Sequence, residues 1–189
     1  FDQAGMFYMA KIDRETQWSE SYDLNPTVKQ TLDPNPKDPA SFSNLLATGR
    51  DDFDFSLSKE TGEHTNVKGY DKLIGETVVI DGVTLQRTEY DYVETDDEGN
   101  ILRQSHGNEY ISAERRNFFS GTSEWFDGTN WLPLDGSPVQ FFMPGEKGFG
   151  ATQPLYECDA VMSDASPLNA LIQPAAYLPQ STPIPQPGH

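Results

Sequence analysis

The stretch that decides the fold is Thr77-Val78-Val79-Ile80-Asp81-Gly82-Val83-Thr84-Leu85, in which an Asp-Gly pair separates two apolar, β-branched runs. Asp-Gly between such runs is typical of a two-residue β-hairpin, because both central turn residues need a positive φ. The second run continues as a long strand over residues 83–94. The sequence therefore predicts an antiparallel pair of strands that turns at Asp81-Gly82.

Short strands joined by turns are predicted on both sides of this hairpin. Residues 52–57 alternate strictly and place Phe53, Phe55 and Leu57 on one face. The acidic segment 96–100 predicts a second hairpin turn near Gly99. A further strand is expected over residues 109–119, between turns at 106–108 and 120–122, and another turn is expected at 127–130. Strands and turns at this spacing are typical of an antiparallel meander.

The fourteen prolines mark the limits of this region, since all of them lie before Ala40 or after Trp131. Proline cannot donate to a β-ladder, so the proline-free span is where paired strands are expected. We predict a mainly β fold with one curved antiparallel sheet, or a partly open barrel, over about residues 51–143. A strand at residues 6–12 and one or two short helices complete it. One helix is expected to begin after Asp38 and end at Gly49, and a second short helical turn is expected to begin at Ser166.

The domain organisation follows from composition. Residues 1–162 are predicted to form a single mostly β domain. Residues 163–189 hold six prolines and one charged residue, Asp164, and this pattern indicates a Pro-rich C-terminal tail or strap over the surface.

The charge balance excludes some partners. Thirty acidic residues against thirteen basic ones give a formal net charge of −17, which argues against nucleic acids and anionic membrane surfaces. No run of 18 apolar residues is present, so no membrane span is expected. The chain begins at Phe1, which would suit a mature end left by a removed signal peptide, and the aromatic-rich β composition favours a periplasmic or secreted protein. Cys158, the single cysteine, rules out an intramolecular disulfide.

No stretch carries a catalytic, metal or cofactor signature. The plausible bases are His64 and His106, and no Gly-x-Ser-x-Gly motif accompanies them. The turn at residues 94–101 loosely resembles a calcium loop, but it has Ser105 where that loop has a glutamate, so no tight calcium site is expected. A carboxylate pair cannot be selected among thirty acidic residues. The expectation is therefore no catalytic residues, no metal and no cofactor.

The long strands lack a clean apolar face, since both faces of residues 83–94 and 109–119 mix polar, charged and aromatic side chains. Such mixing is typical of a curved sheet around a partly wet cavity, and equally of an edge strand or of buried Arg–Glu pairs. If a cavity exists, aromatic residues on neighbouring strands are its expected lining: Tyr90, Tyr92, Tyr110, Phe118, Trp125 and Trp131.

Three functions are compatible with this pattern. The first is an exported, non-enzymatic binding module that holds a small, partly apolar molecule, neutral or cationic because acidic residues dominate. The second is a structural or interaction protein of an envelope or surface assembly, with a protein partner. The third is a carboxylate-pair hydrolase. A large apolar cavity would separate the first from the second, and a tight carboxylate pair in a cleft would favour the third; the oligomeric state stays open.

Overall fold

The computed structural model describes residues 8–24, 27–126 and 128–150. The chain divides into two compact units, residues 1–143 and 144–189, and residues 144–150 are the described part of the second unit. The predicted Pro-rich tail, the helical turn at Ser166 and the predicted boundary at residue 162 lie outside the described residues.

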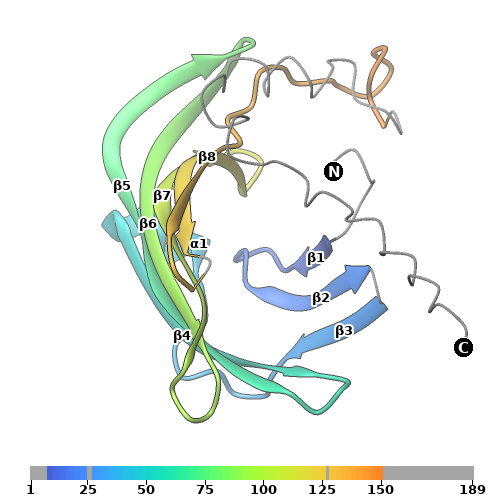
Figure 1. Cartoon of the computed structure of the whole chain (residues 1–189). Helices are drawn as coiled ribbons and strands as arrows, with labels where there is room; N and C mark the ends of the chain where they lie inside the picture. Colours follow the sequence, from blue (N-terminus) through green and yellow to red (C-terminus); the bar gives the residue numbers. More distant parts are fainter. Residues whose placement is uncertain (1–7, 25–26, 127, 151–189) are drawn as a thin grey trace, which may run out of the picture. The chain divides into compact units, whose positions relative to one another are not determined.

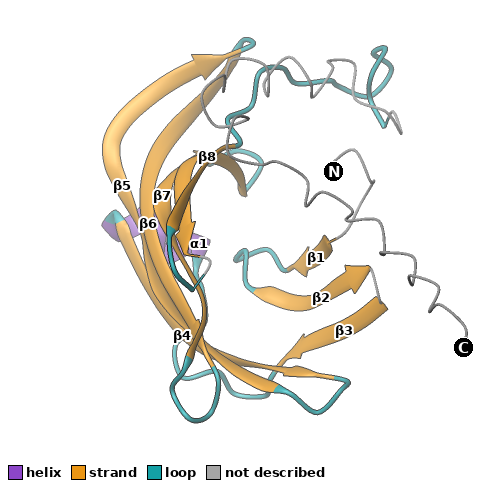
Figure 2. Cartoon of the chain, in the orientation of Figure 1, coloured by secondary structure: helices purple, strands orange, loops and turns teal. Residues whose placement is uncertain are grey.

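The first unit is a single antiparallel sheet in which each strand pairs with the next along the chain. The sheet curls into a half-barrel, with β1, β2 and β3 curving round to face the other strands (Figures 1 and 2). The predicted mainly β, curved antiparallel meander is therefore confirmed. In chain order the elements are β1 (Tyr8–Ile12), β2 (Trp18–Leu24), β3 (Thr27–Leu32), α1 (Phe42–Thr48), β4 (Arg50–Lys59), β5 (His64–Ile80), β6 (Val83–Thr95), β7 (Ile101–Ser112), β8 (Asn117–Phe126) and β9 (Trp131–Asp135).

Both predicted hairpins are present. Asp81 and Gly82 have φ values of 48° and 75° between β5 and β6, where Ile80 pairs with Val83. The turn between β6 and β7 places Gly99 at a φ of 85°. Its backbone is held by Asp96, whose N–H donates to the carbonyl of Asn100 at 3.0 Å. In both turns the positive φ that the sequence pattern requires is the one observed.

The predicted turns at 106–108 and 120–122 and the single strand at 109–119 are wrong. Residues 106–108 lie inside β7, residues 120–122 lie inside β8, and the chain turns at 113–116 instead. The glycines allow close approach of two strands rather than a turn. A Cβ on Gly107 would overlap the carbonyl oxygen of Thr122, and one on Gly121 would overlap the carbonyl oxygen of Asn108.

The N-terminal third contains more sheet than predicted. The sequence does not predict strands β2 and β3, because proline is frequent before Ala40, yet the described prolines of this region, Pro34, Pro36 and Pro39, fall between β3 and α1. Strand β1 matches the strand expected at residues 6–12, of which 6 and 7 lie outside the described part. Helix α1 ends at Gly49 as expected, but Ser41 caps it, and Asp38 instead forms an isolated bridge with Asp54.

Two apolar clusters lie on the inner face of the curl. In the first, Phe42 and Leu45 of α1 pack against Ile111 of β7, with Phe118 at their edge. In the second, Phe55, Leu57 and Val67 pack with Trp18, Leu32, Phe53 and Tyr92. Helix α1 thus covers one end of the inner face, and aromatic rings from β2, β4 and β6 meet at the other.

The hairpin at Asp81-Gly82 provides a test of the fold. We expect Gly82→Val to lower the free energy of unfolding by about 1–2 kcal/mol, because a β-branched residue resists a positive φ. Gly82→Asn is the matched variant, since asparagine tolerates this conformation and should lose less. Urea denaturation measures both. Equal stability of the two variants would contradict the turn geometry.

Candidate functional site

A cavity of about 750 Å³ lies within the curl of the first unit. Its volume is in the range of pockets that hold small molecules, roughly 300–1,000 Å³. Side chains from β1, β2 and β4 to β9 line it, and Ala40 adds the segment just before α1. Nearly the whole meander therefore contributes to one cavity, which is partly open to solvent.

Strand register explains which side chains face this cavity. Gly69, Tyr92, Ser105 and Trp125 are directly paired across β5 to β8, so they share one face of the sheet. Gly69 has no alternative in this row, because a Cβ there would lie 2.7 Å from the Cβ of Tyr92 and 2.8 Å from the ring of Phe53. The glycine therefore allows two aromatic rings to meet over the sheet.

Four of the six predicted site residues line the cavity: Tyr90, Tyr92, Phe118 and Trp125. Tyr110 pairs with Arg87 and Phe119, and it alternates with the inward-facing Glu109, so it lies on the other face of β7. Trp131 lies on β9, where its ring packs on His106 at 4.4 Å and on Phe126 at 5.5 Å. Ligand binding by the four remains a prediction.

Aromatic rings form the apolar wall of the cavity. The Trp18 ring lies edge-on to Phe55 at 6.1 Å and to Tyr92 at 6.3 Å, and Tyr92 stacks with Tyr90 at 6.3 Å. The Tyr90 hydroxyl bonds to Ser105 Oγ at 2.9 Å, and Ser105 donates to the carbonyl of Glu124 at 3.0 Å. Because serine has one O–H, Tyr90 must be the donor, which fixes its ring in the wall.

Two carboxyl groups, those of Asp71 and Glu109, also line the cavity. Burial, reinforced by the charge of Asp51, raises the pKa of Asp71 to about 7. Burial, reinforced by the charge of Asp71, raises the pKa of Glu109 to about 8. Within the described part of the chain, no group donates a hydrogen bond to either carboxyl, so nothing offsets their desolvation.

Their neighbours show why the two carboxyls are unpartnered. Asp51 on β4 pairs directly with Asp71 on β5. The Asp51 carboxylate accepts hydrogen bonds from the N–H of Ser41 at 2.7 Å and from the side-chain amide of Asn44 at 3.0 Å. Thr88, which pairs with Glu109, is fully buried, and its hydroxyl has no hydrogen-bond partner among the described groups. The donors near Asp71 are thus used by Asp51.

These two carboxyls and the lining aromatic residues of β2 and β4 are not among the site residues that the sequence predicts. A usable signal was present, because Asp71 alternates with Val67, Gly69 and Leu73, and Glu109 alternates with Ile111. A carboxylate among side chains that are otherwise apolar or glycine, on the inward face of a strand, indicates a carboxyl group removed from water. Reading it required the register of β5, of which only residues 77–80 were predicted as strand.

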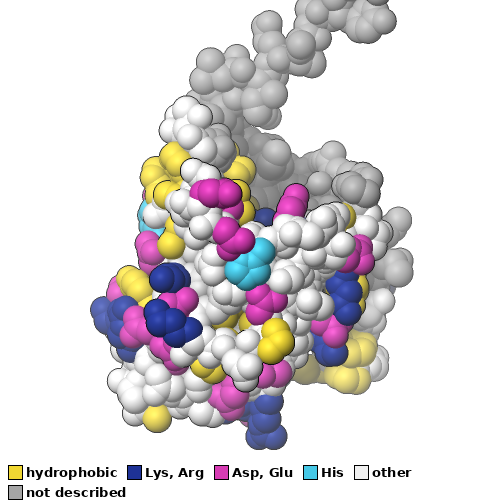
Figure 3. Space-filling model, turned by 90° about the horizontal axis from the view of Figure 1, so that it is seen from below, with side chains coloured by type: hydrophobic (Ala, Val, Ile, Leu, Met, Phe, Trp, Pro, Cys, Tyr) yellow, Lys and Arg dark blue, Asp and Glu magenta, His cyan; other side chains and the backbone are white. Residues whose placement is uncertain are grey.

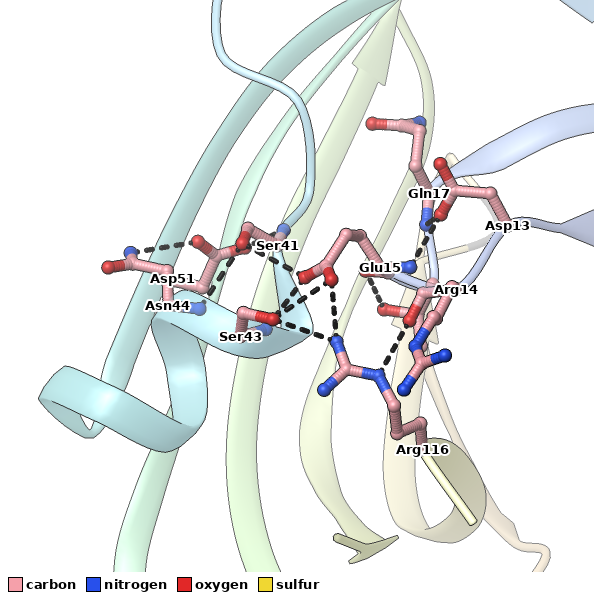
Figure 4. A network of polar contacts seen from close by, with 10 residues as sticks. Asp13, Arg14, Glu15, Gln17, Ser41, Ser43, Asn44, Asp51 and Arg116 are labelled. Atoms are coloured by element: carbon pink, nitrogen blue, oxygen red, sulfur yellow. Dashed lines mark hydrogen bonds and ion pairs between the residues drawn. The ribbon is translucent and has the colours of Figure 1, made fainter. Parts of the chain in front are cut away.

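A polar network ties the N-terminal hairpin to the rest of the sheet (Figure 4). The Glu15 carboxylate accepts from the N–H of Ser43 at 2.8 Å and from Arg116 at 2.7 Å. Arg116 also donates to the carbonyl of Arg14 at 3.0 Å. The backbone hydrogen bond from Ser43 is the largest cause that lowers the pKa of Glu15, and Arg116 adds to it. This Glu15 network joins the β1–β2 connection, α1 and the β7–β8 turn, and so holds Trp18 in the cavity wall.

The acidic turn at residues 96–100 contacts His64, the first residue of β5, through Asp97. His64 lies between Asp97, 2.5 Å from Nδ1, and Asp33, 2.8 Å from Nε2. The contact with Asp97 is the largest cause that raises the His64 pKa. Across the described residues, no group of three or more His, Cys, Asp or Glu side chains has a metal-binding arrangement.

The outer surface pairs many of its charges. Acidic side chains lie beside Lys and Arg on the face drawn in Figure 3, and ion pairs include Lys37–Asp54 at 2.7 Å and Arg50–Asp52 at 2.6 Å. The unpartnered carboxyls inside the cavity contrast with this pattern.

No protein-family model, curated protein or solved structure matches the chain. In the part of the chain that the structure describes, no helix has the length and apolar character needed to cross a membrane.

The cavity carboxyls predict an unusual pH dependence of stability. Their folded pKa values of about 7 and about 8 exceed unfolded values near 4, so the folded state holds more protons between these limits. The free energy of unfolding should therefore fall as the pH rises from about 4 to 8. We expect Asp71→Asn and Glu109→Gln each to stabilise the protein at pH 9 by about 1–3 kcal/mol.

Denaturant titrations across this pH range measure the effect. Glu114 has an exposed carboxyl in the β7–β8 turn. Glu114→Gln removes the same charge and should leave the dependence of stability on pH unchanged. The raised pKa of His64 also makes the free energy of unfolding fall as the pH rises above the ordinary pKa of histidine. Each variant is therefore compared with the parent, which has the same His64. Profiles of Asp71→Asn and Glu109→Gln that coincide with the profile of the parent would contradict the assignment.

The Glu15 network predicts that its loss loosens the hairpin. Glu15→Ala should lower the free energy of unfolding by about 1–2 kcal/mol, because the N–H of Ser43 loses its acceptor and Arg116 its carboxylate. Glu15→Gln should lose less, since its amide oxygen still accepts. A double-mutant cycle with Arg116→Ala measures the coupling, and a coupling energy of zero would remove Arg116 from the network.

Proposed function

We propose that this protein is a non-enzymatic binding module that holds a small, partly apolar molecule inside the half-barrel. The observation that carries the proposal is the cavity of about 750 Å³, whose wall combines aromatic rings with a few polar groups. Ligand sites of proteins have this composition, since apolar surface supplies affinity and a few polar atoms fix orientation. Tyrosine and tryptophan suit such walls because each combines apolar area with one hydrogen-bonding group.

Preorganisation also supports binding. The ring of Tyr90 is fixed by its hydrogen bond to Ser105, and the hairpin bearing Trp18 is held by Glu15 and Arg116. Walls that are already ordered lose little conformational entropy when a ligand enters.

The alternatives have less support. A structural or interaction protein has in its favour the edge strand β9, where Leu134 is 57% exposed, but such a protein needs no cavity. A carboxylate-pair hydrolase has in its favour Asp71 and Glu109, which line one cavity. That chemistry divides acid and base roles between a carboxyl of raised pKa and one that stays ionised. Here the pKa of both is raised, to about 7 and about 8.

We also propose that the protein acts in the periplasm or is secreted, which rests on the composition. Fractionation of source cells with an antibody against the chain tests it, and recovery from the cytoplasmic fraction alone would contradict it.

Binding can be tested with N-phenyl-1-naphthylamine, a neutral dye whose fluorescence rises in apolar cavities. We expect saturable binding to the parent and binding at least about tenfold weaker for Ser123→Phe, a loss of about 1.4 kcal/mol. Ser123 lines the cavity opposite Gly107, so a phenyl ring there fills the space.

Thr122→Phe is the matched control, because the neighbouring residue on β8 is exposed and does not line the cavity. It should bind the dye like the parent. No saturable binding by the parent, or equal binding by both variants, would contradict the proposal.

A further inference from the structure

The charges that line the cavity are unbalanced. Asp71 and Glu109 face the cavity, and within the described part of the chain neither has a hydrogen-bond donor or a basic partner. Arg103 is the basic residue among the described lining, and its guanidinium lies 3.8 Å from the buried carboxylate of Glu94. Its charge is therefore matched by Glu94 rather than by the other two carboxyls.

The same part of the cavity offers aromatic faces. Tyr90 pairs directly with Asp71 on the neighbouring strand, so the two side chains lie side by side on the inner face. Tyr92 stacks with Tyr90 at 6.3 Å. Carboxylates beside aromatic rings are the groups that recognise organic cations, through ion pairing and cation–π attraction.

We propose that the ligand of this cavity is an organic amine with an aromatic or similarly apolar body, whose ammonium group lies against Asp71 and Glu109 while the body lies against the aromatic wall. This inference rests on the proposed binding function and names the ligand class. The apolar part of the wall that receives the body is formed by Trp18, Phe53, Phe55, Tyr92, Phe118 and Trp125.

Other ligand classes leave the carboxyls unsatisfied. An anionic molecule would bring a further negative charge beside two carboxyl groups in a chain of net charge −17, and like charges at short range repel. A neutral molecule can hydrogen-bond to a protonated carboxyl but cannot offset its ionised form. An ammonium group can donate to both carboxyls because it has up to three donors, and its single positive charge balances one ionised carboxylate while the other carboxyl stays protonated.

Proton release is a consequence that only a cationic ligand produces. A positive charge beside the carboxyls favours their ionised forms, so amine binding at pH 7 should release protons from Asp71 and Glu109. Calorimetry in two buffers of different ionisation enthalpy measures this release. Other titratable groups line or adjoin the same face: Asp51 on β4, Tyr90, Tyr92 and Glu94 on β6, and Arg103 on β7. Loss of the proton release in a double variant, Asp71→Asn with Glu109→Gln, would therefore assign the protons to these two carboxyls.

The experiment compares three probes of one shape: tryptamine, the neutral indole-3-ethanol and the anionic indole-3-propionate. Each competes with N-phenyl-1-naphthylamine for the full-length protein at pH 7. We expect tryptamine to displace the dye at concentrations at least about tenfold lower than the alcohol, with the propionate weakest. Tryptamine should release protons, and the alcohol should release none.

The variants separate this inference from the proposed function. Asp71→Asn and Glu109→Gln should each lose most of the preference for tryptamine over the alcohol, measured against that variant's own affinity for the dye. Glu114→Gln makes the same change of charge on the surface and should keep the full preference. Equal displacement by amine and alcohol, or a preference that survives both cavity variants, would overturn the amine assignment and leave the binding function standing. A parent that does not bind the dye would overturn both.

Discussion

One ion pair that joins distant parts of the chain, between Glu15 and Arg116 at 2.7 Å, helps to hold the N-terminal hairpin in the half-barrel. A meander that pairs each strand only with its neighbours has no ladder to close its curl, so the hairpin of β1 and β2 needs another connection to the strands across the curl. Glu15 provides it, because its carboxylate also accepts from the N–H of Ser43 at the start of α1. One carboxylate thus contacts the start of a helix, a hairpin and a distant turn, so its loss would remove several contacts together.

This connection determines what the inner face becomes. With the N-terminal hairpin in place, Trp18 contacts Phe55 and Tyr92 and covers one side of the curl, while Phe42 of α1 covers one end through Ile111. The space between is too polar to collapse, since Tyr90, Ser105 and two carboxyls line it. A cavity persists there because filling it with protein atoms would leave the two carboxyls, which have no donor among the described groups, without water as well.

The sequence predicted what depends on local patterning and missed what depends on register. The alternation of Phe53 and Phe55 and the positive φ required at Asp81-Gly82 are properties of a few adjacent residues, and both predictions are confirmed. Gly107 and Gly121 suggested turns, but they serve close contact between β7 and β8, which depends on residues over ten positions away. The four lining aromatics that were predicted lie on strands whose inner face was recognised as mixed. Tyr110 lies on the other face of β7, which the sequence could not assign because the predicted bounds of that strand were wrong.

Asp71 and Glu109 are the part of the structure that stability alone does not explain. A half-buried carboxyl without a donor costs free energy, and the raised pKa values of about 7 and about 8 express that cost. Asparagine and glutamine would keep the shape at a smaller cost. Elsewhere on the chain the same residue types are paired, as in Asp52 with Arg50 and Glu15 with Arg116. When a fold partners its carboxyls outside and leaves two unpartnered facing a cavity, the missing partner is most simply supplied by what enters the cavity, and an ammonium group is the partner that both carboxyls share.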